Sequence, residues 1–383
     1  MRLPPKRHRR PLPLLLLVCL SLAWPGLAQA QTAASATVRQ TADLRSSAVA
    51  AMPASGLHPQ RLPQTPPAPA FPQTPPAVSY RSIEGDDLTL YAYVGTHVAL
   101  LAPSPDLDQV VVASIVATLD GIYTYYAQAT GRTPYLYLNY EGRTTVAVVP
   151  STCGYGCAYL GATGIELLTP AFDILYTGVR DRNEYDQVVF YEFGRNFWFY
   201  GGQVEYRGAD DTGAITTGYA VFMRFMAMQA TGVTPGPFGQ HDFAYFEDEV
   251  VGLLGRCLTN PACTWDNTLR AGVAPPNPIG LGATDLFASI LFDLRTRYGA
   301  DLINRIWREV ERRPNAATTQ DAVDNFILAA CARSPGGEDE SLHGTDGMIN
   351  LFVDHYRWPM SPAARQEAHL RFGPKIYLPA IQR

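Results

Sequence analysis

Residues 191–198 read Tyr-Glu-Phe-Gly-Arg-Asn-Phe-Trp, and the interpretation of the whole chain depends on this octet. Half of its side chains are aromatic, which is typical of a buried helix. On a helix, Tyr191 and Arg195 share one face, and Glu192 and Arg195 are spaced to form an i, i+3 ion pair. Gly194 costs a helix about 1 kcal/mol relative to alanine, so a glycine at this position usually marks close packing. One interpretation is therefore a packing helix with an internal ion pair.

The octet also resembles the His-Glu-x-x-His helix of the gluzincin metallopeptidases, with Tyr191 and Arg195 in place of the two histidines and Glu192 retained. In that helix, two neutral imidazoles at i and i+4 hold one zinc ion while the glutamate positions a water molecule. Arginine has no lone pair to offer and keeps its positive charge, and tyrosine ligates only as a phenolate. We therefore expect no zinc and no other cofactor.

Two further segments carry the resemblance, which covers roughly residues 85–360 and includes the enhancin-like mucin-targeting peptidases and the basic secretory protein family. These peptidases take a third zinc ligand from a glutamate on the next helix; here residues 216–220 read Thr-Thr-Gly-Tyr-Ala, with Thr217 at the ligand position and Tyr219 close by. Residues 161–168 resemble the edge strand that pairs with an extended substrate, which makes Ile165 and Glu166 candidate ligand-binding residues. All three ligand positions thus depart from the family pattern.

The resemblance implies an α+β fold of the zincin type within residues 81–375. An N-terminal lobe with a mixed β-sheet and helices is expected over about 81–200, and a mainly helical C-terminal lobe over about 201–375. Alternating and periodic apolar residues predict strands at 88–94, 97–101, 135–139 and 144–149. They predict helices from a cap at 104–106 to about 129, at 213–228, 243–254, 285–298, 301–312 and 321–332, and a last one containing Phe352 and Trp358.

The N-terminal segment predicts export. Five basic residues, the apolar run 12–22 and Ala28-Gln-Ala30 form the pattern of a signal peptide over residues 1–30. Its removal changes the formal net charge from −5 to −10, since it carries five basic and no acidic residues, and this argues against nucleic acid or an anionic membrane as partner. No later apolar run predicts a membrane span. We expect a secreted protein, or one held at the cell surface.

Residues 31–80 predict an extended tether. They are rich in Pro, Ala, Ser, Thr and Gln and repeat Pro-Gln-Thr-Pro-Pro at 63–67 and 72–76. Too few apolar groups are present to offset the entropy lost on ordering. At the other end of the chain, residues 376–383 are interpreted as a separate C-terminal tail.

Five cysteines follow the signal peptide. The close pairs Cys153 with Cys157 and Cys257 with Cys263 predict local disulfides in an oxidising compartment, each closing a short loop. A zinc site at these pairs is the alternative, but no histidine cluster accompanies them. Cys331 lies in an apolar run and is expected to be buried.

Three functions compete. The favoured one is a pseudoenzyme that binds an extracellular peptide, protein or glycoprotein through Tyr191, Arg195, Thr217, Tyr219, Ile165 and Glu166. The second is an active peptide hydrolase with Glu192 as catalytic base and a non-standard site. Candidate substitute ligands nearby in sequence are Asp210, Asp211, His241 and Glu247, although none has helical spacing with Glu192. A Glu166–Glu192 pair would instead suggest glycosidase chemistry. The third is a structural or adhesion module. A ligand-binding role predicts Tyr191, Glu192 and Arg195 on the floor of a cleft; a packing role predicts them closed off and paired.

Overall fold

The computed structural model describes residues 71–72, 74–205, 213–334 and 344–373. The predicted signal peptide, most of the predicted tether and the tail 376–383 lie outside the described residues. The strands are β1 (Ala77–Arg81), β2 (Asp87–Val94), β3 (Val98–Ala102), β4 (Asn139–Tyr140), β5 (Arg143–Val149), β6 (Gly156–Ala158), β7 (Ile165–Leu168), β8 (Glu184–Tyr185) and β9 (Thr234–Pro235). The α-helices are α1 (Gln109–Thr130), α2 (Thr169–Arg182), α3 (Val188–Asn196), α4 (Gly201–Val204), α5 (Ala214–Thr231), α6 (Phe243–Thr259), α7 (Ala283–Tyr298), α8 (Ala300–Val310), α9 (Thr319–Arg333), α10 (Gly344–Asn350) and α11 (Pro362–Phe372), and a π-helical turn, η1, covers Leu351–His355.

The main sheet is mixed, as predicted. Its strand order is β1-β2-β3-β5-β7-β6, with β4 paired to the start of β5. β3, β5 and β7 run parallel, whereas β1 and β2 at one side and β6 at the other add antiparallel pairs. Every residue of β3 is buried, as expected for a central strand covered on both faces. The expectation of an α+β fold with an N-terminal mixed sheet is confirmed.

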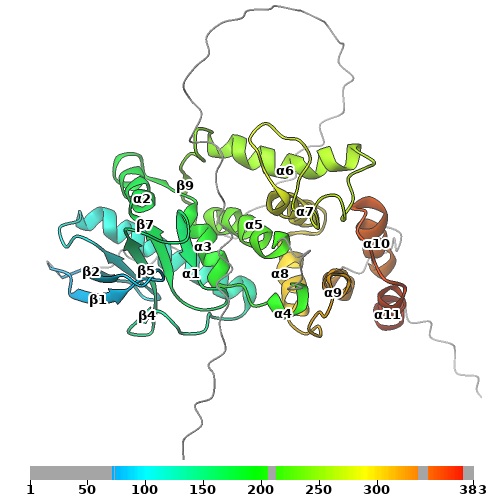
Figure 1. Ribbon diagram of the computed structural model, residues 1–383, viewed down its shortest axis with the longest axis horizontal. Helices are drawn as coiled ribbons and strands as arrows, with labels where there is room; N and C mark the ends of the chain where they lie inside the picture. The colour runs from blue at the N-terminus through cyan, green and yellow to red at the C-terminus, as the bar shows by residue number, and fades with distance from the viewer. Residues whose placement is uncertain (1–70, 73, 206–212, 335–343, 374–383) are drawn as a thin grey trace, which may run out of the picture. The chain divides into compact units, whose positions relative to one another are not determined.

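The two faces of this sheet are covered differently. Helices α1, α2 and α3 pack against one face, and Figure 1 shows them beside the strands. On the other face a smaller apolar cluster contains Tyr80, Leu101 and Val149. The turn after β1 reaches over this face, because the Tyr80 hydroxyl and the Ile83 amide both donate to the Glu166 carboxylate of β7. β1 covers Ala77–Arg81, so the last four residues of the predicted tether, 77–80, belong to the sheet.

The helices follow the predicted order, with differences at the start of α1, at the end of the last predicted helix and in three additional helices, α2, α4 and α11. The cap of α1 is Asp108, which accepts from the amides of Val110 and Val111, rather than a residue at 104–106. Helices α2 and α11 were not predicted; each begins with a proline in its first turn, where the missing amide costs nothing. The last predicted helix ends before Trp358, because the π-helical turn finishes at His355 and Arg357 has a positive φ.

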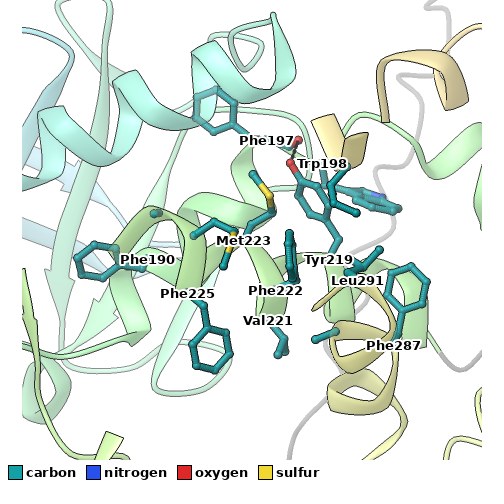
Figure 2. Close-up of a cluster of buried hydrophobic side chains, with 14 of the residues drawn as sticks. Phe190, Phe197, Trp198, Tyr219, Val221, Phe222, Met223, Phe225, Phe287 and Leu291 are labelled. Atoms are coloured by element: carbon teal, nitrogen blue, oxygen red, sulfur yellow. Dashed lines mark hydrogen bonds between the residues drawn. The ribbon is translucent and has the colours of Figure 1, made fainter. Parts of the chain in front are cut away.

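One continuous core joins the sheet side of the molecule to the later helices. Trp198 and Tyr219 lie close together in Figure 2, and both rings also contact Trp307 of α8. Of the described helices, α1 alone is long and apolar enough to span a membrane by length and composition. Half of that stretch is buried inside the protein, and Ile115 and Ile122 belong to the core, so α1 acts here as a core helix.

Gly194 lies where α3 crosses α5, which confirms the predicted close packing. A Cβ atom at Gly194 would lie 2.9 Å from the Ala220 Cα and 3.1 Å from the Tyr126 hydroxyl. Gly194→Ala should therefore lower the free energy of unfolding by about 1–3 kcal/mol through overpacking, as measured by urea denaturation. The matched control is Gly255→Ala in α6, where an added Cβ meets nothing within 4 Å. This control should gain about 0.5–1 kcal/mol, and equal effects at the two positions would contradict the packing account.

Candidate functional site

Helix α3 places Tyr191 and Arg195 side by side on one partly exposed face. The Arg195 Nη1 lies 3.4 Å from the Tyr191 hydroxyl, a long hydrogen bond from the guanidinium to the phenol. The expected ion pair between Glu192 and Arg195 is not formed, since no hydrogen bond or salt bridge joins these two described side chains. The helix turns Arg195 toward Tyr191 at i−4, and the charges of Glu192 and Arg195 interact only at longer range.

Glu192 points the other way, beneath strand β6. Its side chain is 3% exposed, and its Oε2 has no hydrogen-bond partner among the described residues. Gly156 of β6 lies directly against it: a Cβ at Gly156 would stand 2.8 Å from both the Cγ and the Oε1 of Glu192. Burial raises the pKa of Glu192 to about 7, an effect that the positive charge of Arg195 partly offsets. Glu192 is therefore a buried carboxyl that exchanges its proton near neutral pH.

The residues at the three expected zinc-ligand positions do not fit a zinc site. The guanidinium of Arg195 is a donor only, and Tyr191 is held as a phenol because burial raises its pKa. Thr217 of α5 is partly exposed and brings only a hydroxyl. Among the described residues, no group of three or more His, Cys, Asp or Glu side chains is placed to hold a metal ion.

Several predicted site residues lie in the core instead. Ile165 is fully buried against the helices, so it cannot contact a ligand. Tyr219 is fully buried too; its hydroxyl donates to the Phe197 carbonyl over 3.5 Å, a bond visible in Figure 2. Helical periodicity explains this, because α5 turns Tyr219 toward Trp198 and away from Thr217.

Glu166 is a structural residue on the opposite face of the sheet. Its neighbours Ile165 and Leu167 point toward the helices, so the alternation of a strand directs Glu166 away from α3. Its carboxylate accepts from Tyr80, Ile83 and Thr152 at 3.0, 2.7 and 2.8 Å. A Glu166–Glu192 pair acting on one substrate, as in a glycosidase, is therefore wrong.

The edge strand is β6 rather than the predicted segment 161–168. β7 is covered on both sides, by β5 and by β6, whereas β6 ends the strand order. Between β6 and β7 the chain reverses its direction through Gly161 and Gly164, which both have positive φ. The sequence alone does not reveal this reversal. The segment between β6 and β7 is attached to α3, because the Asn196 side chain donates to the Tyr159 and Gly164 carbonyls.

The substitute ligands do not assemble around Glu192. Asp210 and Asp211 lie outside the described residues. His241 pairs through its backbone with Phe238, and its ring lies against Tyr245. Glu247 is partly buried, which raises its pKa. Neither His241 nor Glu247 forms a hydrogen bond or ion pair with Glu192 in the described structure.

Arg224 of α5 belongs to the same neighbourhood, although no motif identifies it. It is 5% exposed, donates to the Gln187 side chain at the start of α3, and lies over the Tyr191 ring at 6.0 Å. Burial lowers its pKa, and none of the described carboxylates forms an ion pair with it. Arg224 follows Thr217 by seven residues, or two helical turns, so both lie on one face of α5. This spacing is the sequence signal that could have identified Arg224.

Both predicted disulfides are present, and Cys331 is buried with a free thiol. The bridges fit an oxidising, extracellular-type environment. No protein-family model matches the chain, and no curated protein gives a significant sequence match. The geometry around α3 and β6 is therefore the basis for a functional conclusion.

Proposed function

We propose that this chain is an exported protein of the zincin type that has lost its zinc site and binds an extended peptide or glycopeptide without cutting it. The observation that carries the proposal is the Glu192 carboxyl, which is 3% exposed and has an oxygen without a hydrogen-bond partner in the described structure. Buried polar groups in folded proteins are nearly always satisfied, so an unpaired oxygen beneath β6, one residue along α3 from Tyr191, supports a polar ligand at this point.

The open edge of β6 supports an extended ligand. Amides of Leu168 and Tyr159 donate to the carbonyls of Tyr155 and Gly164, so the hydrogen-bonded pairs of this ladder involve Tyr155, Cys157 and Tyr159. The alternation of an antiparallel pair then directs the N–H and C=O groups of Gly156 and Ala158 away from β7. A peptide added at this edge would find unpaired backbone groups, the usual mode of β-augmentation.

Glu192 beneath this edge, and Tyr191 and Arg195 on the partly exposed face of α3, together complement a peptide group. Glu192 accepts hydrogen bonds when ionised, whereas Arg195 and Tyr191 donate. A peptide amide carries one donor and one acceptor, and the hydroxyls of a sugar can play either part. In the proposed complex an N–H or O–H of the ligand bonds to Glu192, and an oxygen of the ligand accepts from Arg195.

An active hydrolase is the second candidate, favoured by the pKa of Glu192 near 7, which burial produces and which suits a general base at neutral pH. In that case Glu192 would take a proton from water and Arg195 would stabilise the oxyanion. Without a metal ion the attacking water keeps its high pKa, so the gain in rate would be small. The pseudoenzyme is therefore the better-supported function.

The test is binding of the full exported protein to arrays of peptides and glycopeptides. Arg195→Ala should weaken binding about tenfold or more, because hydrogen bonds to a charged group contribute about 1.5–3 kcal/mol. The matched control is Arg180→Ala, which removes an exposed arginine paired with its neighbour Asp181. Ala158→Pro removes the outward amide of β6 and leaves the inward ladder at Cys157 intact, so it should also weaken binding.

Two outcomes would contradict the proposal. One is the absence of any ligand for the unaltered protein, both with its disulfides intact and after mild reduction. The other is a ligand whose affinity is the same for the unaltered protein, Arg195→Ala and Ala158→Pro. Cleavage of a bound peptide that Glu192→Gln abolishes would instead establish the hydrolase.

A further inference from the structure

We propose that the Cys153–Cys157 disulfide is a redox-sensitive latch that holds Gly156 over Glu192, and that its reduction opens the site to ligand. This inference rests on the proposed function, because it concerns access to the same carboxyl. Gly156 is part of the short loop that the bridge closes, with a sequence separation of 4 between the two cysteines. The Glu192 side chain packs directly against this glycine. A covalent link therefore lies one residue from the group that covers the buried carboxyl.

The loop is also held at its C-terminal end by the pairing of β6 with β7, in which Gly156 and Cys157 lie opposite Leu167 and Glu166. The Tyr155 carbonyl accepts from the Leu168 amide at 3.0 Å, and Tyr155 itself is 44% exposed. Two of the residues between the cysteines are glycines, Gly154 and Gly156, which adopt the widest range of backbone conformations. Without the bridge, the pairing with β7 would restrain this segment from one side alone.

Both ends of the loop are held firmly, which confines any opening to the latch itself. Before the loop, the Thr152 hydroxyl donates to Glu166 at 2.8 Å. After it, the Tyr159 carbonyl accepts from Asn196 at 3.0 Å. The segment between these two points can move while β7 and α3 stay in place, provided that the start of β6 separates from β7.

The size of the loop points to a local role for the bridge. In the chain-entropy account, a disulfide stabilises a fold less as the loop it closes becomes shorter, and this loop is near the lower limit. The bridge therefore adds little to global stability. Its main effect is to fix the backbone of residues 153–157.

The bridge is open to thiol–disulfide exchange from one side. Cys153 is partly exposed, whereas Cys157 is 6% exposed. A thiolate of a dithiol reductant would attack the Cys153 Sγ, form a mixed disulfide and release the Cys157 thiolate, which takes a proton. The second thiol of the reductant would then displace Cys153 as a thiol, leaving the reductant oxidised by two electrons. The other bridge, Cys257–Cys263, is buried at both sulfurs and provides the internal comparison.

The experiment measures the reactivity of Glu192 in the full exported protein by carbodiimide coupling and peptide mass spectrometry. The samples are the unaltered protein, Cys153→Ala/Cys157→Ala, and the control Cys257→Ala/Cys263→Ala. We expect coupling at Glu192 to rise about tenfold in the first double variant and to stay unchanged in the control. A tenfold rise corresponds to a local opening that becomes more favourable by about 1.4 kcal/mol. Glu141, exposed on a turn, normalises the reaction between samples.

A second measurement protects the test against a variant that fails to fold. Mild treatment of the unaltered protein with dithiothreitol should reduce Cys153–Cys157 first, because Cys153 is partly exposed whereas both cysteines of the other bridge are buried, and should raise Glu192 coupling in step. Mass spectrometry would first confirm that Cys153–Cys157 is reduced. If Glu192 coupling is then unchanged, the latch is overturned. A rise of equal size on reduction of Cys257–Cys263 alone would overturn it too.

The latch and the proposed function fail in different ways. If Glu192 coupling rises on reduction but no peptide or glycopeptide binds to either form, the latch stands and the proposed function fails. If Arg195→Ala abolishes binding but coupling never changes, the proposed function stands and the latch fails.

Discussion

Glu166→Ala should lower the free energy of unfolding by about 3–5 kcal/mol, because it leaves buried donors without their shared acceptor. The Glu166 carboxylate accepts from the Tyr80 hydroxyl, the Ile83 amide and the Thr152 hydroxyl. These three donors come from β1, from the turn after it and from the segment before β6. Glu166 of β7 therefore ties the first hairpin and the segment before β6 to the sheet, and urea denaturation measures the loss.

The matched control is Asp87→Ala, which removes a carboxylate that pairs with Arg81 at 2.9 Å on the surface. Both of these side chains are mostly exposed, so the control should change stability by less than about 1 kcal/mol. A loss at Glu166 no larger than the loss at Asp87 would show that the hydrogen-bonded tie is not what holds the first hairpin over the sheet.

Glu192→Gln should have the opposite effect and make the protein more stable above neutral pH. The unaltered carboxyl has a pKa of about 7 in the folded protein against the ordinary 4.5, because burial disfavours its ionised form. Folding therefore favours the protonated carboxyl. The stability that Glu192 contributes is full below pH 4.5, falls as the pH rises to about 7 and is constant above it.

At 1.36 kcal/mol per pH unit, the interval from 4.5 to about 7 corresponds to a loss of up to about 3 kcal/mol. Glutamine does not ionise, so the variant should lack this fall. The measurement is urea denaturation of both proteins at pH 4 and pH 8. The stability of Glu192→Gln relative to the unaltered protein should increase between these two values. A constant difference would mean that Glu192 ionises freely in the folded state and is not buried beneath β6.

The sequence predicts the parts of this fold that depend on local patterns. Apolar runs locate β2, β3 and β5 to within two residues, because strand alternation is a local property. Helical spacing locates α7, α8 and α9 to within two residues, whereas α5 and α6 begin where predicted but end three and five residues later. Gly194 indicates a close contact because glycine is costly in a helix unless something packs against it, and Ala220 fills that role. The short spacing of the cysteine pairs predicts both disulfides.

The site is predicted less well, because its geometry depends on which way side chains turn once elements pair. Ile165 and Glu166 are neighbours in sequence, yet β7 directs one into the helical core and the other to the opposite face. The edge position of β6 depends on a reversal of the chain at 161–164. Arg224 lies outside every motif and joins Tyr191 only because α3 and α5 cross. Long-range packing of this kind leaves little trace in a single sequence.

The metal content of the full protein, purified without chelator and measured by mass spectrometry, tests the central claim most directly. The account predicts no zinc bound in proportion to protein, because an arginine, a phenol and a threonine stand at the three ligand positions. The contradicting result is one equivalent of bound zinc and a peptide-cleaving activity, both lost on treatment with a chelator. That result would show that the metal site is retained and that the protein is not a pseudoenzyme.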